Sequence, residues 1–291
     1  MAVVLTVVFA VLAALSNASA MVLQRSAART VPQSDAFSLR LMLDLVRHPA
    51  WLGGMLTVLC AAVFQALALA VGSLALVQPI FVTELTFVLL IACAVFRRRL
   101  PSLGWFGIIA VTLGIGLALA SAAPSGGRDH AAAAVWVLTL AAGGGAMVCC
   151  VLAALPYGRG KARAALFGAS AAIGYALTAA LMKTSVSAAG HGVTAFFTCW
   201  ATYAFAAVGG CSLFLLSNAV ESGPLLASQP ALTLGDAVTS LALGILVYGE
   251  HVRTGWWLLP EAVGALLVAA GVMVLPRVET QALGPRPSAA T

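Results

Sequence analysis

Apolar side chains dominate this chain in long uninterrupted runs, each about as long as a lipid bilayer requires. A helix rises 1.5 Å per residue, so about 20 apolar residues cross a hydrocarbon core of about 30 Å. Nine such runs lie at residues 2–23, 51–71, 74–96, 104–121, 132–155, 164–184, 193–217, 225–248 and 256–275. The pattern predicts an all-α, polytopic membrane bundle of about nine transmembrane helices.

The composition agrees with this pattern. The 291 residues are 62% hydrophobic and 8% charged, whereas soluble domains carry about 25% charged residues. The nine runs leave room only for loops. We therefore expect one transmembrane domain over residues 1–275, followed by a short polar cytoplasmic tail over 276–291.

The first run has two interpretations. It ends in Ala18-Ser19-Ala20, which resembles the cleavage site of a signal peptide. However, no Lys or Arg precedes the run, and its apolar character continues to Leu23. We favour a retained helix, with processing as the alternative.

The segment 25–50 is too polar to span a membrane. Phe37, Leu41 and Leu45 recur every fourth residue, while charged residues mark another face. This spacing predicts an amphipathic helix on the membrane surface, in contact with lipid headgroups.

The distribution of Lys and Arg predicts the orientation. With the N-terminus outside, twelve basic residues fall on the cytoplasmic side and three, at 128, 183 and 253, fall on the outer side. The twelve are Arg25, Arg29, Arg40, Arg47, Arg97, Arg98, Arg99, Arg159, Lys161, Arg163, Arg277 and Arg286. Because basic loops stay in the cytoplasm, we expect a plasma-membrane protein with its N-terminus outside and its C-terminus inside.

Several function classes lack support in the sequence. The net charge of +6 is spread over short loops, which argues against a nucleic-acid partner. The six cysteines lie in apolar runs without a CxxC spacing, and neither HExxH, GxSxG nor a Walker sequence is present. We therefore expect no enzyme, no resident cofactor and no nucleic-acid binding.

The chain contains an internal repeat at an offset of 151 residues. Gln78-Pro79 aligns with Gln229-Pro230, and Gly104-Trp105 aligns with Gly255-Trp256. Runs two, three and four then correspond to runs seven, eight and nine, with repeat one at about 1–121 and repeat two at about 132–275. Because counterparts are five spans apart, they cross in opposite directions. This inverted repeat is typical of transporters.

Three of the nine acidic residues, Glu84, Asp236 and Glu261, fall within apolar runs. Glu84 and Asp236 lie at the centres of their runs, and the offset of 151 places Asp236 beside Glu84 in the repeat. An uncompensated acid at mid-bilayer costs about 2.5–3.5 kcal/mol, so such acids usually face a cavity or a partner. The pair predicts a cation or proton site, with Asp236 and Glu84 as candidate metal ligands; packing between helices is the alternative.

Polar residues extend this candidate pathway. On the eighth run, a stripe spaced four, three and four residues apart follows one helix face. The stripe consists of Gln229, Thr233, Asp236 and Ser240. Gln78, Asn17 and Gln65 are further candidates, although each could merely bridge helices.

Two prolines and two charges at span ends complete the pattern. Pro79 and Pro230 each lack an amide hydrogen, so each predicts a kink in its helix. Such a kink either frees carbonyl groups at membrane depth or only adjusts helix packing.

Glu261 and Lys183 lie near the outer ends of their runs, where we expect them to reach the interface.

Glycines fall in two further groups within the runs. Gly143-Gly144-Gly145 and the stretch from Gly168 to Gly174 predict close contacts between helices.

Three stretches resemble the drug/metabolite transporter superfamily, of EamA-like type. They are the run from Gln65 to Pro79, the basic turn Arg97-Arg-Arg-Leu-Pro-Ser-Leu-Gly-Trp105, and Gly244-Ile-Leu-Val-Tyr-Gly-Glu-His251. Nine spans and Ser16-Asn17-Ala-Ser19 on the first run are similar to the NIPA-type magnesium-transporter branch. The family's first-half turn often carries Glu where this chain has Arg98, whereas the second half keeps Glu250.

The resemblance implies a secondary transporter that works by alternating access, with Mg²⁺ or a small organic solute as cargo. We expect a central cavity lined by the first, third and eighth runs. A proton-coupled exporter of a small metabolite or cationic drug is the alternative, and a non-transporting membrane scaffold or lipid-handling protein is a third hypothesis. The sequence leaves open whether the chain forms a homodimer.

Overall fold

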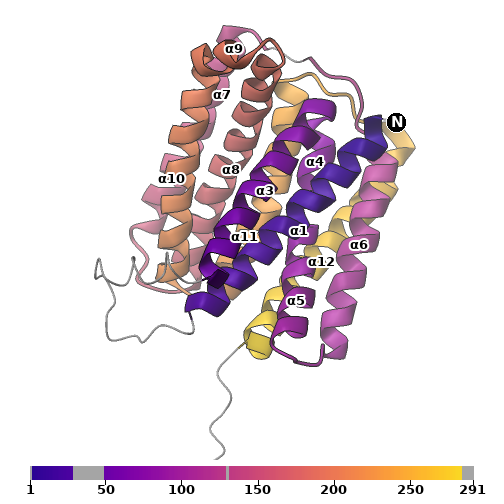
Figure 1. The fold of residues 1–291 in the computed structure, drawn as a ribbon, viewed down its shortest axis with the longest axis vertical. Coiled ribbons are helices and arrows are strands. Elements are labelled where there is room, and N and C mark those ends of the chain that lie inside the picture. Colours follow the sequence, from indigo (N-terminus) through magenta and orange to yellow (C-terminus); the bar gives the residue numbers. More distant parts are fainter. Residues whose placement is uncertain (1, 29–48, 129–130, 284–291) are drawn as a thin grey trace, which may run out of the picture.

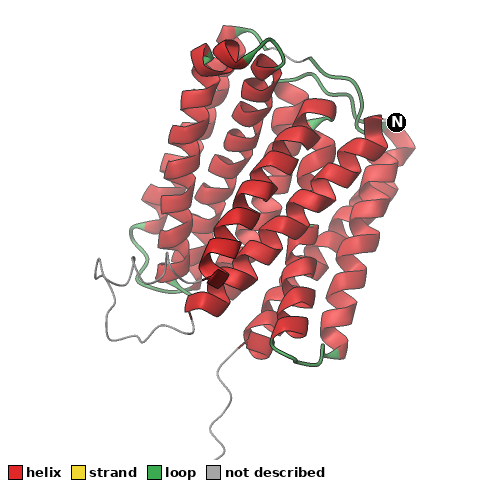
Figure 2. Cartoon of the chain, viewed as in Figure 1, coloured by secondary structure: helices red, strands yellow, loops and turns green. Residues whose placement is uncertain are grey.

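A computed structural model describes residues 2–28, 49–128 and 131–283 of the chain. In this part, regular structure is helical, apart from one isolated antiparallel bridge between Ser125 and His251 (Figure 2). The helices are α1 (Ala2–Ala28), α3 (Pro49–Val71), α4 (Leu74–Phe81), α5 (Thr83–Val95), α6 (Ser102–Ala122), α7 (Ala133–Ala154), α8 (Lys161–Ala189), α9 (Val193–Thr198), α10 (Trp200–Ser222), α11 (Leu225–Leu246) and α12 (Leu258–Leu283), the last preceded by the 3₁₀ turn η2 (Gly255–Trp257). They run lengthwise through one bundle (Figure 1).

Eight segments of the described chain are long and apolar enough to cross a membrane. They correspond to eight of the nine apolar runs, with α4 and α5 counted as one span. The eighth run forms α11, which is 22 residues long, carries the polar stripe and is not among these eight segments. The chain is therefore a multi-pass membrane protein.

Three boundaries differ from the predicted ones. The seventh run, expected at 193–217, breaks at Cys199, whose backbone is extended, so the long helix α10 occupies Trp200–Ser222 instead. The third run divides at Val82 just after Pro79, whereas α11 continues through Pro230. The last helix, α12, continues through Pro276 to Leu283. The amphipathic segment expected at 25–50 lies largely outside the described residues.

Close helix packing depends on small residues. On α8, a Cβ at Gly168 would lie 2.7 Å from the carbonyl oxygen of Ser228 on α11, and a Cβ at Gly174 would clash with Ser212 on α10. Gly143 on α7 likewise faces Leu177 of α8, but Cβ atoms at Gly144 and Gly145 would meet no atom within 4 Å. The contacts predicted at Gly143, Gly168 and Gly174 are confirmed, and those at the two adjacent glycines are wrong.

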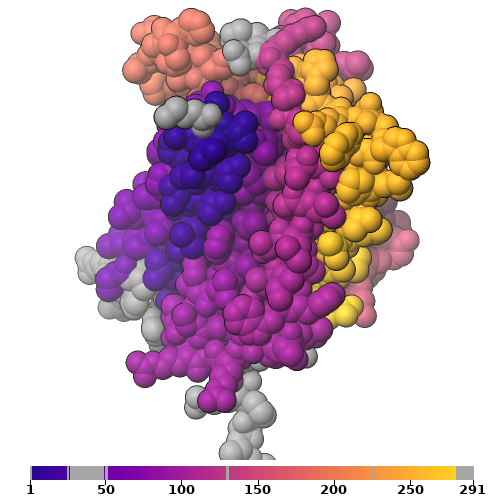
Figure 3. All heavy atoms as spheres, turned by 90° about the vertical axis from the view of Figure 1, so that its right-hand side faces the viewer, coloured from indigo at the N-terminus to yellow at the C-terminus, as the bar shows by residue number. Residues whose placement is uncertain are grey.

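The outer surface of the bundle is apolar. Along α6, which runs down the middle of the face shown in Figure 3, Trp105, Phe106, Ile109 and Leu113 are all more than half exposed. In water such a surface would be unfavourable, whereas lipid chains cover it without cost. The structure therefore has the exterior that a membrane protein requires.

The two ends of the bundle carry different numbers of basic residues. The end that holds the N-terminus, which we call the N-terminal end, includes Arg128, Arg253 and the α8 residue Lys183. Among the described residues, the opposite end carries the basic turn of Arg97, Arg98 and Arg99, the loop charges Arg159, Lys161 and Arg163, and Arg277. The separation of basic residues predicted by the loop pattern is thus present in the fold.

Candidate functional site

The two central acids come from different helices and lie near each other inside the bundle. Glu84 lies ten residues after the start of α4 at Leu74 and eleven before the end of α5 at Val95. Asp236 lies eleven residues after the start of α11 and ten before its end. The two carboxyl groups are close enough to interact electrostatically, and both also interact with the hydroxyl group of Tyr175 on α8.

Neutral polar groups surround this acid pair. The hydroxyl group of Ser240 donates to Oδ1 of Asp236 at 3.3 Å, one turn along α11. The side-chain amide of Asn17, on α1, is the polar neighbour of Glu84. Neither acid has an ion-pair partner among the residues that the structure describes. The pair therefore offers oxygen atoms and negative charge without a resident cation.

Burial of the polar stripe of α11 increases along the helix. Gln229, Thr233 and Asp236 are half-buried, whereas Ser240 is completely buried. Beyond Ser240, Leu243 is also buried. The residue of the stripe nearest to the N-terminal end is therefore the one that the packed bundle encloses.

The other candidate pathway residues occupy different environments. Gln78 on α4 is 3% exposed, and its Nε2 atom has no hydrogen-bond partner within the described chain. Gln65 lies half-buried on α3. Of the predicted site residues, the structure brings together Asn17, Glu84, Asp236 and Ser240, and it places Gln78 in the packed part of the bundle.

A second charged cluster lies at the N-terminal end, and sequence reasoning missed it. Glu250 follows α11 and is 3% exposed. Its Oε1 accepts hydrogen bonds from the amide of Leu74 and from Nζ of Lys183, both at 2.7 Å, and its Oε2 accepts one from the amide of Ala75 at 2.8 Å. A carboxylate at this place is favoured because the first turn of a helix has free N–H groups and a partial positive charge.

The expectation that Lys183 reaches the interface is therefore wrong. The residue is 7% exposed, and its ammonium group lies 4.6 Å above the centre of the Tyr248 ring as well as on Glu250. A buried ammonium group is stable only with such partners. The signal was present in the sequence, because the predicted topology places Lys183 and Glu250 at the same end with opposite charges.

Tyr248 links this cluster to α8. Its hydroxyl group donates to the carbonyl oxygen of Ala180 and accepts from the hydroxyl group of Thr184 at 2.9 Å. The ring packs edge-on against Trp136 of α7, with centroids 6.3 Å apart. The turn after α11 is therefore fixed to two neighbouring helices by completely buried contacts.

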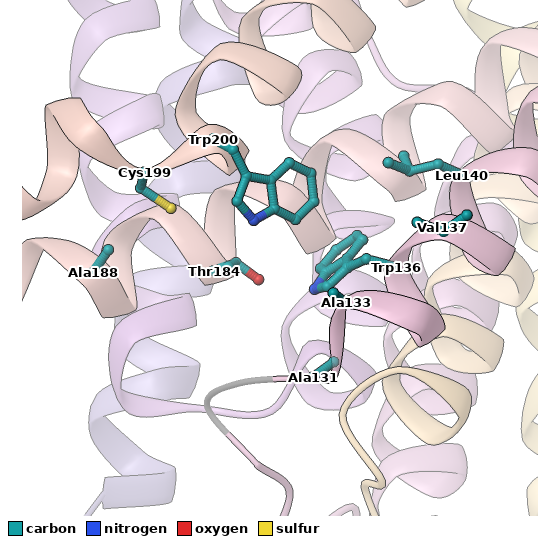
Figure 4. Close-up of a pocket in the computed structure, with 9 residues that line it drawn as sticks. All are labelled: Ala131, Ala133, Trp136, Val137, Leu140, Thr184, Ala188, Cys199 and Trp200. Atoms are coloured by element: carbon teal, nitrogen blue, oxygen red, sulfur yellow. The ribbon is translucent and has the colours of Figure 1, made fainter.

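An aromatic pocket of about 540 Å³ lies beside this turn. In Figure 4, the rings of Trp136 and Trp200 lie close together with Thr184 beside them, and Cys199 and aliphatic side chains complete the lining. None of the predicted pathway residues lines this pocket. It is separate from the acid pair and contains no charged group.

Glu261 lies apart from both clusters. It is half-buried on α12, and its Oε2 atom has no hydrogen-bond partner in the described residues. Among the described residues, no charged group lies close enough to interact electrostatically with the Glu261 carboxylate, whereas Glu84 interacts with Asp236 in this way. Glu261 is therefore a useful control for the two central acids.

Comparison with known proteins gives one full-length relative. An uncharacterized protein of Corynebacterium glutamicum is 26% identical over 284 residues, which cover 96% of this chain and 97% of that protein. No family model matches the chain. No solved structure matches it either.

Proposed function

We propose that this protein is a plasma-membrane secondary transporter that moves a small solute or cation by alternating access. The observation that carries the proposal is the proximity of Glu84 and Asp236 midway along their helices, half-buried and without a basic partner among the described residues. Buried acids are costly in a membrane, so their retention inside the bundle supports a pathway. We expect this pathway to be lined by α1, α5 and α11, which carry Asn17, Glu84 and Asp236.

Helix packing supports the inverted repeat behind this proposal. In the first half, α1 packs along α3 and against α5; in the second half, α8 packs along α10 and α11. The expected counterparts also touch one another, since α4 contacts α11 and α6 contacts α12. Two halves related by a twofold axis in the membrane plane would produce these contacts, and substrates of such transporters bind near that axis.

Mg²⁺ is the first cargo that we propose. Magnesium keeps several of its waters and binds through one or two carboxylates. The acid pair, with the amide of Asn17 and the hydroxyl group of Ser240 nearby, has this composition. No group of three or more His, Cys, Asp or Glu able to hold a metal occurs among the residues that the structure describes. A transported, largely hydrated ion needs no such cage.

Proton-coupled export of a small metabolite or cationic drug is the second proposal. It is favoured by the pairing of two acids that share the same interior, because one proton can replace the charge of a cationic cargo at this site. The hydroxyl group of Tyr175, close to both acids, gives a further group through which such a proton can be exchanged.

Uptake by proteoliposomes tests these proposals. We expect purified protein to admit Mg²⁺, measured with an enclosed fluorescent indicator. Asp236→Asn should lower the rate at least about tenfold, because the site then keeps only one of its two carboxylates, that of Glu84. A parallel assay with an enclosed pH indicator and a cationic dye separates cation uptake from proton exchange.

Glu261→Gln is the matched control, since it removes an acid from α12 outside the pair and should leave the rate unchanged. Unaltered uptake in Asp236→Asn would contradict the site. Absence of flux for every probe, in protein that remains folded, would favour the scaffold hypothesis.

A further inference from the structure

The N-terminal end of the bundle is closed by buried contacts between elements that lie far apart in the sequence. Glu250 binds Lys183 on α8 and the first two amides of α4. The loop that follows α6 is joined to the same turn, since the amide of Arg128 donates to the carbonyl oxygen of Tyr248 at 2.7 Å. One turn of chain after α11 thus connects both halves of the molecule.

This closure lies beyond the half-buried part of the polar stripe. Asp236 is half-buried, Ser240 one turn later is completely buried, and Glu250 follows with 3% exposure. In alternating access, a cation bound at Asp236 would have to pass this closure to reach the N-terminal end. Opening the N-terminal end requires α4 and α8 to separate from the turn that carries Glu250.

We infer that Lys183 and Glu250, seated on the first turn of α4, form the gate that closes the transport pathway at the N-terminal end of the bundle. The inference rests on the proposed transport function. Glu250 occupies the free amides of α4 when the gate is closed, and water replaces it there when the gate opens. Lys183 and Glu250 are positioning residues in this scheme, because neither contacts the acid pair at mid-depth.

The chemistry of the cluster suits a two-state gate. A buried ion pair gives little net stability relative to apolar contacts, since both charges must be removed from water, but loss of one partner leaves the other charge unsatisfied. The pair therefore separates as a unit or remains closed. Gly244 on α11 permits this closure, because a Cβ there would clash with the Glu250 carboxylate.

Chemical labelling of a cysteine at the buried end of the stripe tests the gate without any cargo. In a variant whose six native cysteines are replaced by Ala, Ser240→Cys reports on the closed end. A membrane-impermeant maleimide is added from the side of the N-terminal end. With the pair intact we expect slow labelling; Lys183→Met combined with Glu250→Gln should raise the rate by at least about tenfold, as the equilibrium shifts toward the open gate.

Two variants keep this result interpretable if folding is affected. Lys183→Arg retains the positive charge and should remain slow, and Arg253→Met removes a positive charge from the same end without a contact to Glu250. Thr233→Cys, on the half-buried part of the stripe, should be labelled from the opposite side at the same rate in both backgrounds, which confirms the fold.

An unchanged Ser240→Cys rate in the neutral double variant would overturn the gate and leave Lys183 and Glu250 with a structural role alone. Failure of the transport proposal is distinguishable, because it shows as an absence of flux in the unmodified protein while labelling remains dependent on the ion pair.

Discussion

At the scale of single residues, the acids of this protein are stabilised in opposite ways. Glu250 has a basic partner and two backbone donors, so its charge is matched by fixed groups. Glu84 and Asp236 lie near each other with only neutral neighbours in the described chain. A charge with three fixed donors holds structure together, whereas Glu84 and Asp236 have no such donors among the described residues, which is why we propose a mobile cation or proton as their partner.

The close packing of the Glu250 carboxylate against Gly244 predicts the effect of a substitution at Gly244. Ala normally stabilises a helix relative to Gly by about 1 kcal/mol. At Gly244 the added methyl group would meet the Glu250 carboxylate, and the amide of Ala75 lies only 3.3 Å away. We expect Gly244→Ala to lower the free energy of unfolding by about 1–3 kcal/mol, measured as a reduced thermal midpoint in detergent.

Gly210→Ala on α10 is the matched control, because a Cβ at Gly210 meets no atom within 4 Å. It should keep or slightly raise the midpoint. Equal midpoints for the two variants would show that the Glu250 cluster adapts to the methyl group.

At the scale of helices, the pair α6 and α12 shows how close approach is achieved without polar contacts. Cβ atoms at Gly114 and Gly264 would each lie 2.7 Å from the carbonyl oxygen of the other glycine. Seven residues away on each helix, a Cβ at Gly271 would lie 2.8 Å from the carbonyl oxygen of Gly107. Apolar attraction gives no driving force between helices in lipid, so this backbone proximity is what makes packing favourable.

A side chain at this contact should separate the two helices. Gly264→Leu would place Cβ 2.6 Å from the backbone nitrogen of Ala118, where no rotamer relieves the overlap. We expect a large loss of monodisperse protein on size-exclusion chromatography. Gly116→Leu on α6 adds the same side chain where no atom lies within 4 Å, so its elution profile should match that of the unmodified protein; a similar loss in both would point to the leucine rather than the contact.

At the scale of the whole molecule, the apolar runs predicted the helices well because burial in lipid leaves a chain few alternatives to a helix. The offset of 151 predicts that Glu84 and Asp236 are equivalent in the two halves, and the structure places them close enough to interact electrostatically; the repeat itself stays a prediction. The break at Cys199 had no Gly or Pro to mark it. The pairing of Lys183 with Glu250 was missed because the sequence pattern assigns a charge only to one end of the bundle. Which charges pair at that end depends on how α4, α8, the loop after α6 and the turn after α11 pack together.

The same charge distribution predicts which end faces the cytoplasm. Among the described residues, the basic turn at Arg97–Arg99 and the loop at 158–163 lie at one end, opposite Arg128 and Arg253. Because basic loops are retained in the cytoplasm, we expect Ser125→Cys to react with an impermeant maleimide in intact cells and Ser102→Cys to react only after permeabilisation. Both positions are exposed, and the cysteine-free variant supplies the background. The reverse order of labelling would overturn the assignment of the outer end and would place the Lys183–Glu250 gate on the cytoplasmic side.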